Sequence, residues 1–139
     1  MQYAEVKQIL SNCPDLADLD DAALGTLLWR GVELALGPGT AIYVAGTPLD
    51  DTFCVLLSGD LVVEQAGAVV GQIAAQQIFG EMAYFTNAHL RTATVRVGGQ
   101  PATVLKFPLS RAELSEGFSS LKKLLGRLAW SRFVSTSQA

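Results

Sequence analysis

One short segment in the middle of the chain holds the side chains with the clearest chemical meaning. A glycine and a carboxylate, Gly80 and Glu81, precede an arginine, Arg91. The guanidinium offers a planar, charged fork for phosphate oxygens. The carboxylate can accept a hydrogen bond from a sugar hydroxyl, as acidic residues do for ribose in other nucleotide sites. Gly80 lets the backbone approach closely, and the amides of Met82 and Ala83 can point at an anion if they open a short helix. The segment therefore predicts a site for a phosphate joined to a sugar.

Short strands must position these groups, because residues 40–107 consist of small β-rich runs separated by turn residues. Strands this short and this regularly punctuated are typical of a small barrel or jelly roll. The predicted strands are 41–44, 53–57, 61–64, 69–73, 92–97 and 103–107, with a hairpin turn at 65–67.

Helices are expected before and after the strands. Apolar residues recur at helical spacing in the first segment, which Pro14 ends, and Asp18 or Asp20 can cap a second helix before the break at Gly37-Pro38-Gly39. After the strands, Ser110 and Glu113 form a capping-box pattern.

The last predicted helix covers residues 118–133, after an interruption at Gly117. Its apolar side consists of Leu121, Leu124, Leu125, Leu128 and Trp130. We therefore expect one mainly β domain of the α+β class. It has N-terminal helices (1–36), a small antiparallel β-roll or jelly roll (37–107) and C-terminal helices (110–134), the last of them amphipathic.

Composition narrows the class of protein. The chain has 139 residues, half of them apolar, which is enough for one core. No apolar run approaches the roughly 20 residues of a membrane span, and no secretory signal is visible, so a cytoplasmic location is expected. A net charge of −3 argues against a nucleic-acid surface. The basic residues Lys122, Lys123, Arg127 and Arg132 are interpreted as a solvated helix face.

The sequence offers no set of residues for catalysis or for a metal. Cys13 and Cys54 lie far apart without metal-ligand spacing, and Cys54 is expected to be a small buried apolar residue. The single histidine, His89, lacks partners and is expected to be exposed. We predict that the protein is not an enzyme and has no metal and no cofactor.

The segment from Phe79 to Val95 resembles the phosphate-binding cassette of the cyclic nucleotide-binding domain family. The resemblance spans the chain from about residue 9 and is greatest to bacterial catabolite-activator-like regulatory domains, here without a DNA-binding domain. Residues 46–60 resemble the family's G-D-x-x-x-x-x-Y-x-V-x-x-G stretch, and their glycines are interpreted as structural turns. Two positions depart from the pattern: Leu90 replaces a frequent proline, and Ala75-Gln76-Gln77 replaces a turn that usually has glycine.

The resemblance implies a role for each residue of the segment. Arg91 and nearby amides would hold a cyclic phosphate, and Glu81 the ribose 2′-hydroxyl. A hydroxyl at Thr92 can serve the phosphate or a guanine amine, so both bases stay open and cAMP is only mildly preferred over cGMP. The predicted ligand-binding set is Gly80, Glu81, Met82, Ala83, Arg91, Thr92, Ala93, Val63, Val70, Ile73 and Trp130.

Some of these positions have a second interpretation. Val63, Val70 and Ile73 would line the base and sugar or simply belong to the core of the roll. Trp130, Phe133 and Thr136 are candidates for a lid over the base, although core packing is the favoured role of Trp130. The side chain of Met82 is expected to pack inward.

Two functions of different classes are therefore predicted. The first is a sensor or regulatory domain that binds a cyclic nucleotide and repositions its C-terminal helix, through which an effector domain or protein would be engaged. The second is a protein-interaction or dimerisation domain of the same fold with no nucleotide ligand, in which that helix forms a homodimer or a docking surface.

Overall fold

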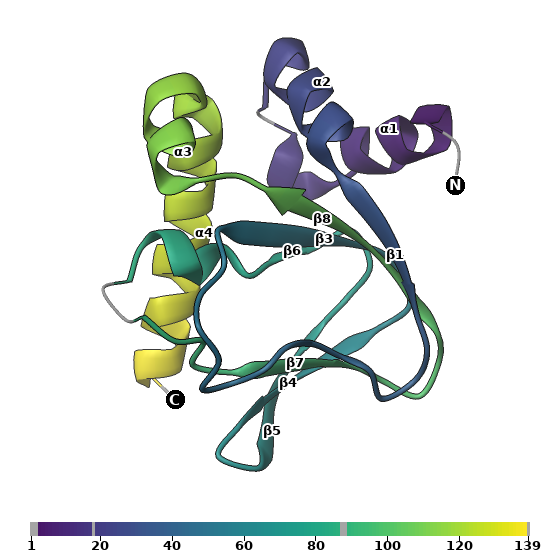
Figure 1. Ribbon diagram of the computed structural model, residues 1–139, viewed down its shortest axis with the longest axis vertical. Helices are drawn as coiled ribbons and strands as arrows, with labels where there is room; N and C mark the ends of the chain where they lie inside the picture. Colours follow the sequence, from purple (N-terminus) through teal and green to yellow (C-terminus); the bar gives the residue numbers. More distant parts are fainter. Residues whose placement is uncertain (1–2, 18, 87–88, 139) are drawn as a thin grey trace.

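Two antiparallel four-stranded sheets face each other across the centre of the molecule (Figure 1). The computed structural model describes residues 3–17, 19–86 and 89–138, with side chains for residues 4–17, 19–86 and 89–132. One sheet has the strand order β1-β8-β3-β6, and the other has the order β2-β7-β4-β5. The strands are β1 (Val32–Leu36), β2 (Ala41–Tyr43), β3 (Thr52–Ser58), β4 (Leu61–Gln65), β5 (Ala68–Ile73), β6 (Ile78–Phe79), β7 (Thr94–Val97) and β8 (Ala102–Pro108).

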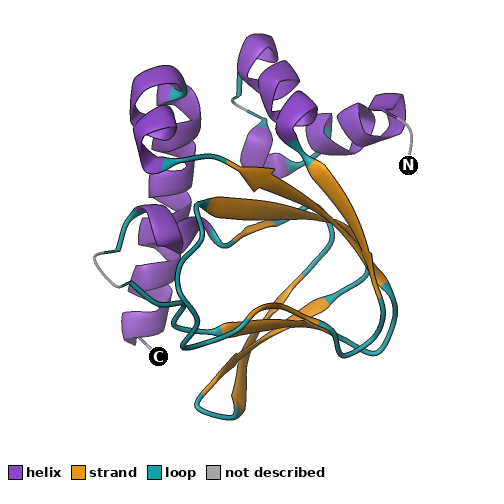
Figure 2. Cartoon of the chain, viewed as in Figure 1, coloured by secondary structure: helices purple, strands orange, loops and turns teal. Residues whose placement is uncertain are grey.

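The helices gather over the β1-β8-β3-β6 sheet, and the last of them runs along one end of the roll (Figure 2). Two of the helices begin at the cap residues that the sequence predicted. The Ala23 amide donates to Asp20 Oδ1 at 2.7 Å, and Ser110 and Glu113 complete the capping box. The elements are α1 (Tyr3–Ser11), α2 (Asp21–Arg30), α3 (Arg111–Gly117) and α4 (Ser119–Gln138), with 3₁₀ turns η1 (Pro14–Leu16) and η2 (Glu81–Tyr84).

Strand β3 contributes to two cores, because successive side chains of a strand point to opposite faces of the sheet. Phe53 and Val55 lie in the cluster that the helices cover, whereas Cys54 and Leu56 lie in the cluster inside the roll. All four are fully buried. The central sheet therefore joins the helical layer to the roll.

The predicted α+β, mainly β fold, with helices before and after the roll in sequence, is confirmed. Two strands escaped prediction. Residues expected at the end of the N-terminal helices form β1, because α2 ends at Gly31, whose amide donates to Leu27, and the next five residues pair with β8. The two-residue strand β6 is too short to show a period. No described helix is long and apolar enough to cross a bilayer.

Candidate functional site

Gly80 shapes the start of the η2 turn. Its φ of +84° is a left-handed conformation, and an added Cβ would come within 2.8 Å of the Tyr43 ring. Glycine is therefore required here for both conformation and space. The Ala83 amide, predicted to face an anion, donates within the turn to the Gly80 carbonyl at 3.4 Å.

The far end of η2 is tied to the helix that follows the roll. Arg111, the first residue of α3, donates to the carbonyls of Ala83 and Thr86, the latter at 3.0 Å. The start of the turn therefore lies against the Tyr43 ring, and its end is held by α3.

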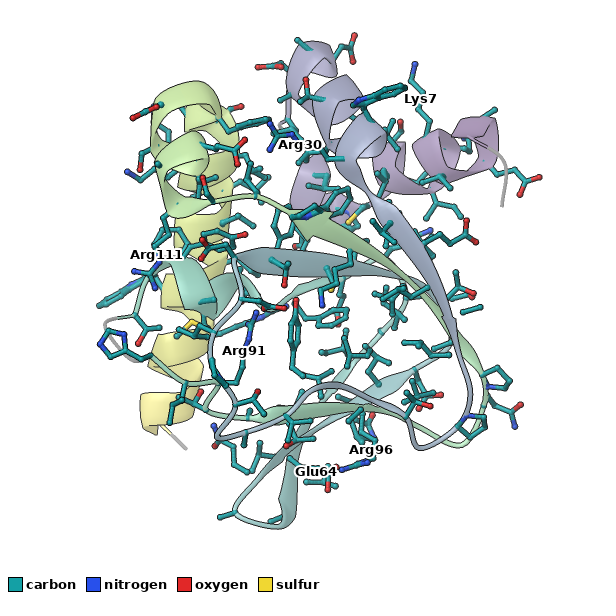
Figure 3. The ribbon with its side chains drawn as sticks, viewed as in Figure 1. Lys7, Arg30, Glu64, Arg91, Arg96 and Arg111 are labelled. Atoms are coloured by element: carbon teal, nitrogen blue, oxygen red, sulfur yellow. The ribbon has the colours of Figure 1, made fainter. Side chains whose placement is uncertain are left out.

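The Arg91 side chain points into the roll and lies over the Tyr43 ring, with Cζ 3.8 Å from the ring centroid (Figure 3). Its Nη2 donates to Asp50 Oδ1 at 2.5 Å, and its Nη1 donates to the Gly80 carbonyl at 3.3 Å. Only 8% of the arginine is exposed. The structure therefore brings Arg91 to the cassette turn, as the sequence predicted, although the two lie in separate elements.

The loop between β2 and β3 also forms backbone hydrogen bonds with Arg91. The Gly46 amide donates to the Arg91 carbonyl at 2.9 Å, and the Arg91 amide donates to the Thr47 carbonyl at 2.8 Å. Gly46 has a φ of +84°, which agrees with its predicted role as a structural turn.

Asp50 is the residue of this loop that sequence reasoning missed as part of the site. Partial burial raises the pKa of its carboxyl, but hydrogen bonds from Arg91 and Thr52 and the charge of Lys106 outweigh burial and leave that pKa below its usual value. Asp50 is therefore ionised at neutral pH and orients the arginine. Its place in the glycine-acid stretch of residues 46–60 was the available signal.

Glu81 is buried beneath the C-terminal helix, with 1% of its surface exposed. Its Oε1 accepts a hydrogen bond from Arg132 Nη1 at 2.5 Å, and Arg132 Nη2 donates to the Ile78 carbonyl at 2.6 Å. Burial raises the pKa of Glu81, although the charge of Arg132 opposes that rise. Arg132 was expected on a solvated face, and that expectation was wrong, because its partners in β6 and η2 lie far away in sequence. Lys122, Lys123 and Arg127 are exposed as predicted.

Two buried polar side-chain atoms in the described residues have no hydrogen-bond partner, and both belong to predicted recognition residues. They are Oε2 of Glu81 and Nε of Arg91. A buried polar atom without a partner costs free energy comparable to a lost hydrogen bond. One buried acceptor and one buried donor beside the cassette turn are thus left without a partner within the protein.

The other predicted residues divide between the roll and its surface. Ile73 is buried in the roll cluster and Val63 packs against it, whereas Val70 is 57% exposed on the β4–β5 hairpin, so a core role for Val70 was wrong. Thr92 is exposed and Ala93 is half-buried in the approach to β7.

Two aromatic and apolar side chains differ from their predicted burial. Trp130 is 66% exposed and Met82 is 38% exposed, so the packing of Trp130 in the core and the inward packing of Met82 were wrong. The side chains of Phe133 and Thr136 lie outside the described residues. His89 is exposed and Cys54 is buried, as predicted.

A hollow of about 260 Å³ opens between η1 and α4, away from Arg91. Its lining includes Pro14, Asp15 and Leu124 but none of the predicted site residues. Within the described residues, no three His, Cys, Asp or Glu side chains gather in a way that could hold a metal ion.

The profile of the cyclic nucleotide-binding domain matches residues 33–113, which is more than half of the chain. The chain belongs to the cyclic nucleotide-binding domain family. The matched range contains the Gly80-Glu81 turn, Arg91 and the loop that holds it. No curated protein sequence matches the chain.

Several solved structures share the fold. The sensor domain of the transcriptional regulator DNR from Pseudomonas aeruginosa superposes with a TM-score of 0.76 at 18% identity, over 99% of this chain and 95% of that one. A Geobacter metallireducens protein that was solved as a candidate cyclic nucleotide-binding protein superposes with a TM-score of 0.72 at 18% identity, over 97% of each chain. The regulatory domain of Toxoplasma gondii protein kinase A, crystallised with cAMP, superposes with a TM-score of 0.77 at 22% identity. The match covers 93% of this chain and 50% of that one. The chain thus spans about half the length of the kinase regulator. At these identities the likeness concerns the fold.

Proposed function

We propose that this domain binds a cyclic nucleotide, cAMP in preference to cGMP, and acts as a regulatory module. The observation that carries the proposal is the pair of unpartnered buried atoms beside Gly80, a carboxylate oxygen of Glu81 and the Nε of Arg91. A cyclic nucleotide supplies the complement of each, because its ribose hydroxyl is a donor and its phosphate oxygens are acceptors. The cAMP bound to the Toxoplasma regulator is consistent with this ligand class.

In this proposal Arg91 turns its fork from the carbonyls that now surround it toward the phosphate. The Tyr43 ring holds the arginine at the turn while its fork exchanges Asp50 for the phosphate, so little movement is needed. Amides of the turn, with Met82 first among them, and the hydroxyl of Thr92 complete the phosphate site. Val63 and Ile73 contact the sugar and base, with Val70 at the rim of the hairpin and Trp130 as a partner for the base.

The same proposal gives the C-terminal helix its role. Glu81 now binds Arg132 of α4, and the ribose hydroxyl competes for that carboxylate. A ligand shifts an equilibrium only by its differential affinity for the two states. The two states differ in the partner of Glu81, which is the ribose in one and Arg132 of α4 in the other. Nucleotide binding therefore weakens the attachment of α4 and repositions this helix.

Calorimetric titration with cAMP and cGMP tests the proposal, together with thermal unfolding. At a ligand concentration near 100 times Kd, binding adds about 2.7 kcal/mol, which is roughly 5–10 °C in a domain of this size. Arg91→Lys keeps the charge but loses the fork, so we expect at least a tenfold loss of affinity. Arg96→Lys is the matched control, because Arg96 pairs with Glu64 away from the turn. Equal affinity in the Arg91→Lys variant and the unaltered protein would overturn the mechanism.

A second function is favoured by one specific observation. Arg91 and Glu81 already have internal partners in Asp50 and Arg132, as in a domain that keeps the fold without a nucleotide. Such a domain would use α4 for dimerisation or for docking on an effector. An unchanged melting temperature with both nucleotides, together with a concentration-dependent mass, would favour this function.

A further inference from the structure

Lys106 is a second cation at the Arg91 site. Its Nζ lies 3.3 Å from Oδ2 of Asp50, while Arg91 Nη2 holds Oδ1 of the same carboxylate. Both cations also lie near the ring of Tyr43, with Arg91 Cζ at 3.8 Å and Lys106 Nζ at 5.4 Å from its centroid. The two positive charges therefore share one carboxylate, that of Asp50, and one aromatic ring, that of Tyr43.

The position of Lys106 in β8 is unusual for a lysine. Ala102 and Val104, at alternate positions of the same strand, lie in the apolar cluster inside the roll. Lys106 continues that row, is paired in register with the buried Cys54 and is 26% exposed. A charged group is costly to place against an apolar interior unless its charge is compensated. The carboxylate of Asp50 compensates it here.

The cluster nevertheless carries one uncompensated charge, because two cations share a single anion. That balance matters when Arg91 releases Asp50 to bind a phosphate. Without Lys106, the freed carboxylate would keep the Thr52 hydroxyl but no cation beside a second negative group, and like charges at this range repel. With Lys106 present, Asp50 keeps a cationic partner throughout.

We infer that Lys106 is a positioning residue of the anion site, which holds Asp50 while Arg91 engages the phosphate and keeps the cluster one charge positive. This excess matches the single negative charge of a phosphodiester. The inference rests on the proposed function and deepens it, because it assigns the charge selectivity of the site to a residue that does not itself touch the ligand.

Calorimetric titration of the full chain with cAMP tests the role of Lys106. Lys106→Gln makes the cluster neutral, and we expect affinity to fall about tenfold, as for the loss of one nearby charge. Lys106→Arg keeps the charge and should remain within about threefold of the unaltered protein. Lys122→Gln, on the outer face of α4, makes the same change of net charge far from the site and should leave affinity unchanged.

A double variant separates charge balance from a purely structural role. In Lys106→Gln with Asp50→Asn the excess of one positive charge returns, so we expect affinity to recover to within about threefold of the unaltered protein. A lysine that only supported the fold would not give this recovery. A double variant weaker than Lys106→Gln, or a Lys106→Gln affinity equal to that of the unaltered protein, would overturn the inference while leaving nucleotide binding intact. Absence of binding by the unaltered protein would overturn both.

Discussion

A left-handed backbone at a residue other than glycine is the clearest local strain in the molecule. Gln76 has a φ of +70° in the turn between β5 and β6. Its amide donates to the Leu56 carbonyl at 2.6 Å, and its carbonyl accepts the Cys13 thiol at 2.6 Å. These backbone contacts fix the conformation whatever the side chain, and glycine is the residue that adopts it without strain.

Gln76→Gly should therefore stabilise the protein. Removing the left-handed strain should raise the free energy of unfolding by roughly 1–2 kcal/mol. The greater freedom of glycine in the unfolded chain lowers it again in part, so we expect a net gain of about 1 kcal/mol. Urea denaturation measures it. Gln100→Gly, at an exposed position without a positive φ, is the control and should not stabilise. A loss of stability in Gln76→Gly would show that its side chain contributes more than its backbone costs.

The two carboxylates of the site should affect stability with opposite signs. Burial raises the pKa of Glu81, so the folded protein binds a proton there more readily than the unfolded chain does, and stability falls as pH rises from about 4.5 through the raised value. Asp50 has a lowered pKa, so its contribution is present above about 3.8 and is lost as pH falls through the lowered value.

Denaturation at pH 7 and at several pH values well below 3.8 tests these signs. Glu81→Gln should be more stable than the unaltered protein at pH 7, because no charge is buried, and the difference should shrink in acid. Asp50→Asn should be less stable at pH 7, and that gap should also close in acid. Two variants with the same sign at pH 7 would contradict the assignment.

At the scale of elements, the sequence indicates features that depend on neighbouring residues, such as helix caps. It misses strands that are defined by pairing with a distant segment. The Asp20 cap and the Ser110 capping box lie within four residues of their targets, so both could be predicted. Strand β1 was missed, because its alternation of half-buried Leu34 and Leu36 with exposed residues covers only five residues, and pairing with β8 defines the strand.

The candidate site shows the same limit. Gly80, Glu81 and Arg91 stand out in a family pattern. The groups that hold them, Asp50 and Arg132, lie 41 residues from Arg91 and 51 residues from Glu81, respectively. The fold chooses such partners: Asp50 had a signal in the glycine-acid stretch of residues 46–60, whereas no sequence pattern pointed to Arg132.

Arg132 is the side chain that attaches the second half of α4 to the cassette. Arg132→Ala removes hydrogen bonds to Glu81 and to the Ile78 carbonyl and leaves a buried carboxylate without its cation. We expect a loss of about 1–3 kcal/mol and faster amide exchange in α4 beyond Gly126. Hydrogen exchange read by mass spectrometry measures both. Lys123→Ala, exposed on the same helix, is the control. Unchanged exchange beyond Gly126 would show that other contacts hold the helix.

The whole molecule is expected to unfold as one unit, because its two cores share strands. Phe53 and Val55 of β3 belong to the helix-covered cluster, and Cys54 and Leu56 belong to the roll. Strand β8 also contributes to both cores, because Leu105 belongs to the helix-covered cluster and Val104 belongs to the roll. Loss of either core would expose one face of the sheet on which the other depends, as in a cooperative small domain.

One truncation in each core tests this cooperativity. Leu27→Ala, in the helix-covered cluster, and Leu56→Ala, in the roll, each remove a fully buried leucine and should each cost about 3 kcal/mol. Hydrogen exchange in low concentrations of denaturant is followed in α2 and in β4. If the cores are coupled, each substitution lowers the opening free energy of both elements by the same amount, because both exchange through global unfolding. If Leu27→Ala weakens α2 and leaves β4 unchanged, the helices and the roll are separate cooperative units, and a ligand in the roll could release the helices without loosening the sheets.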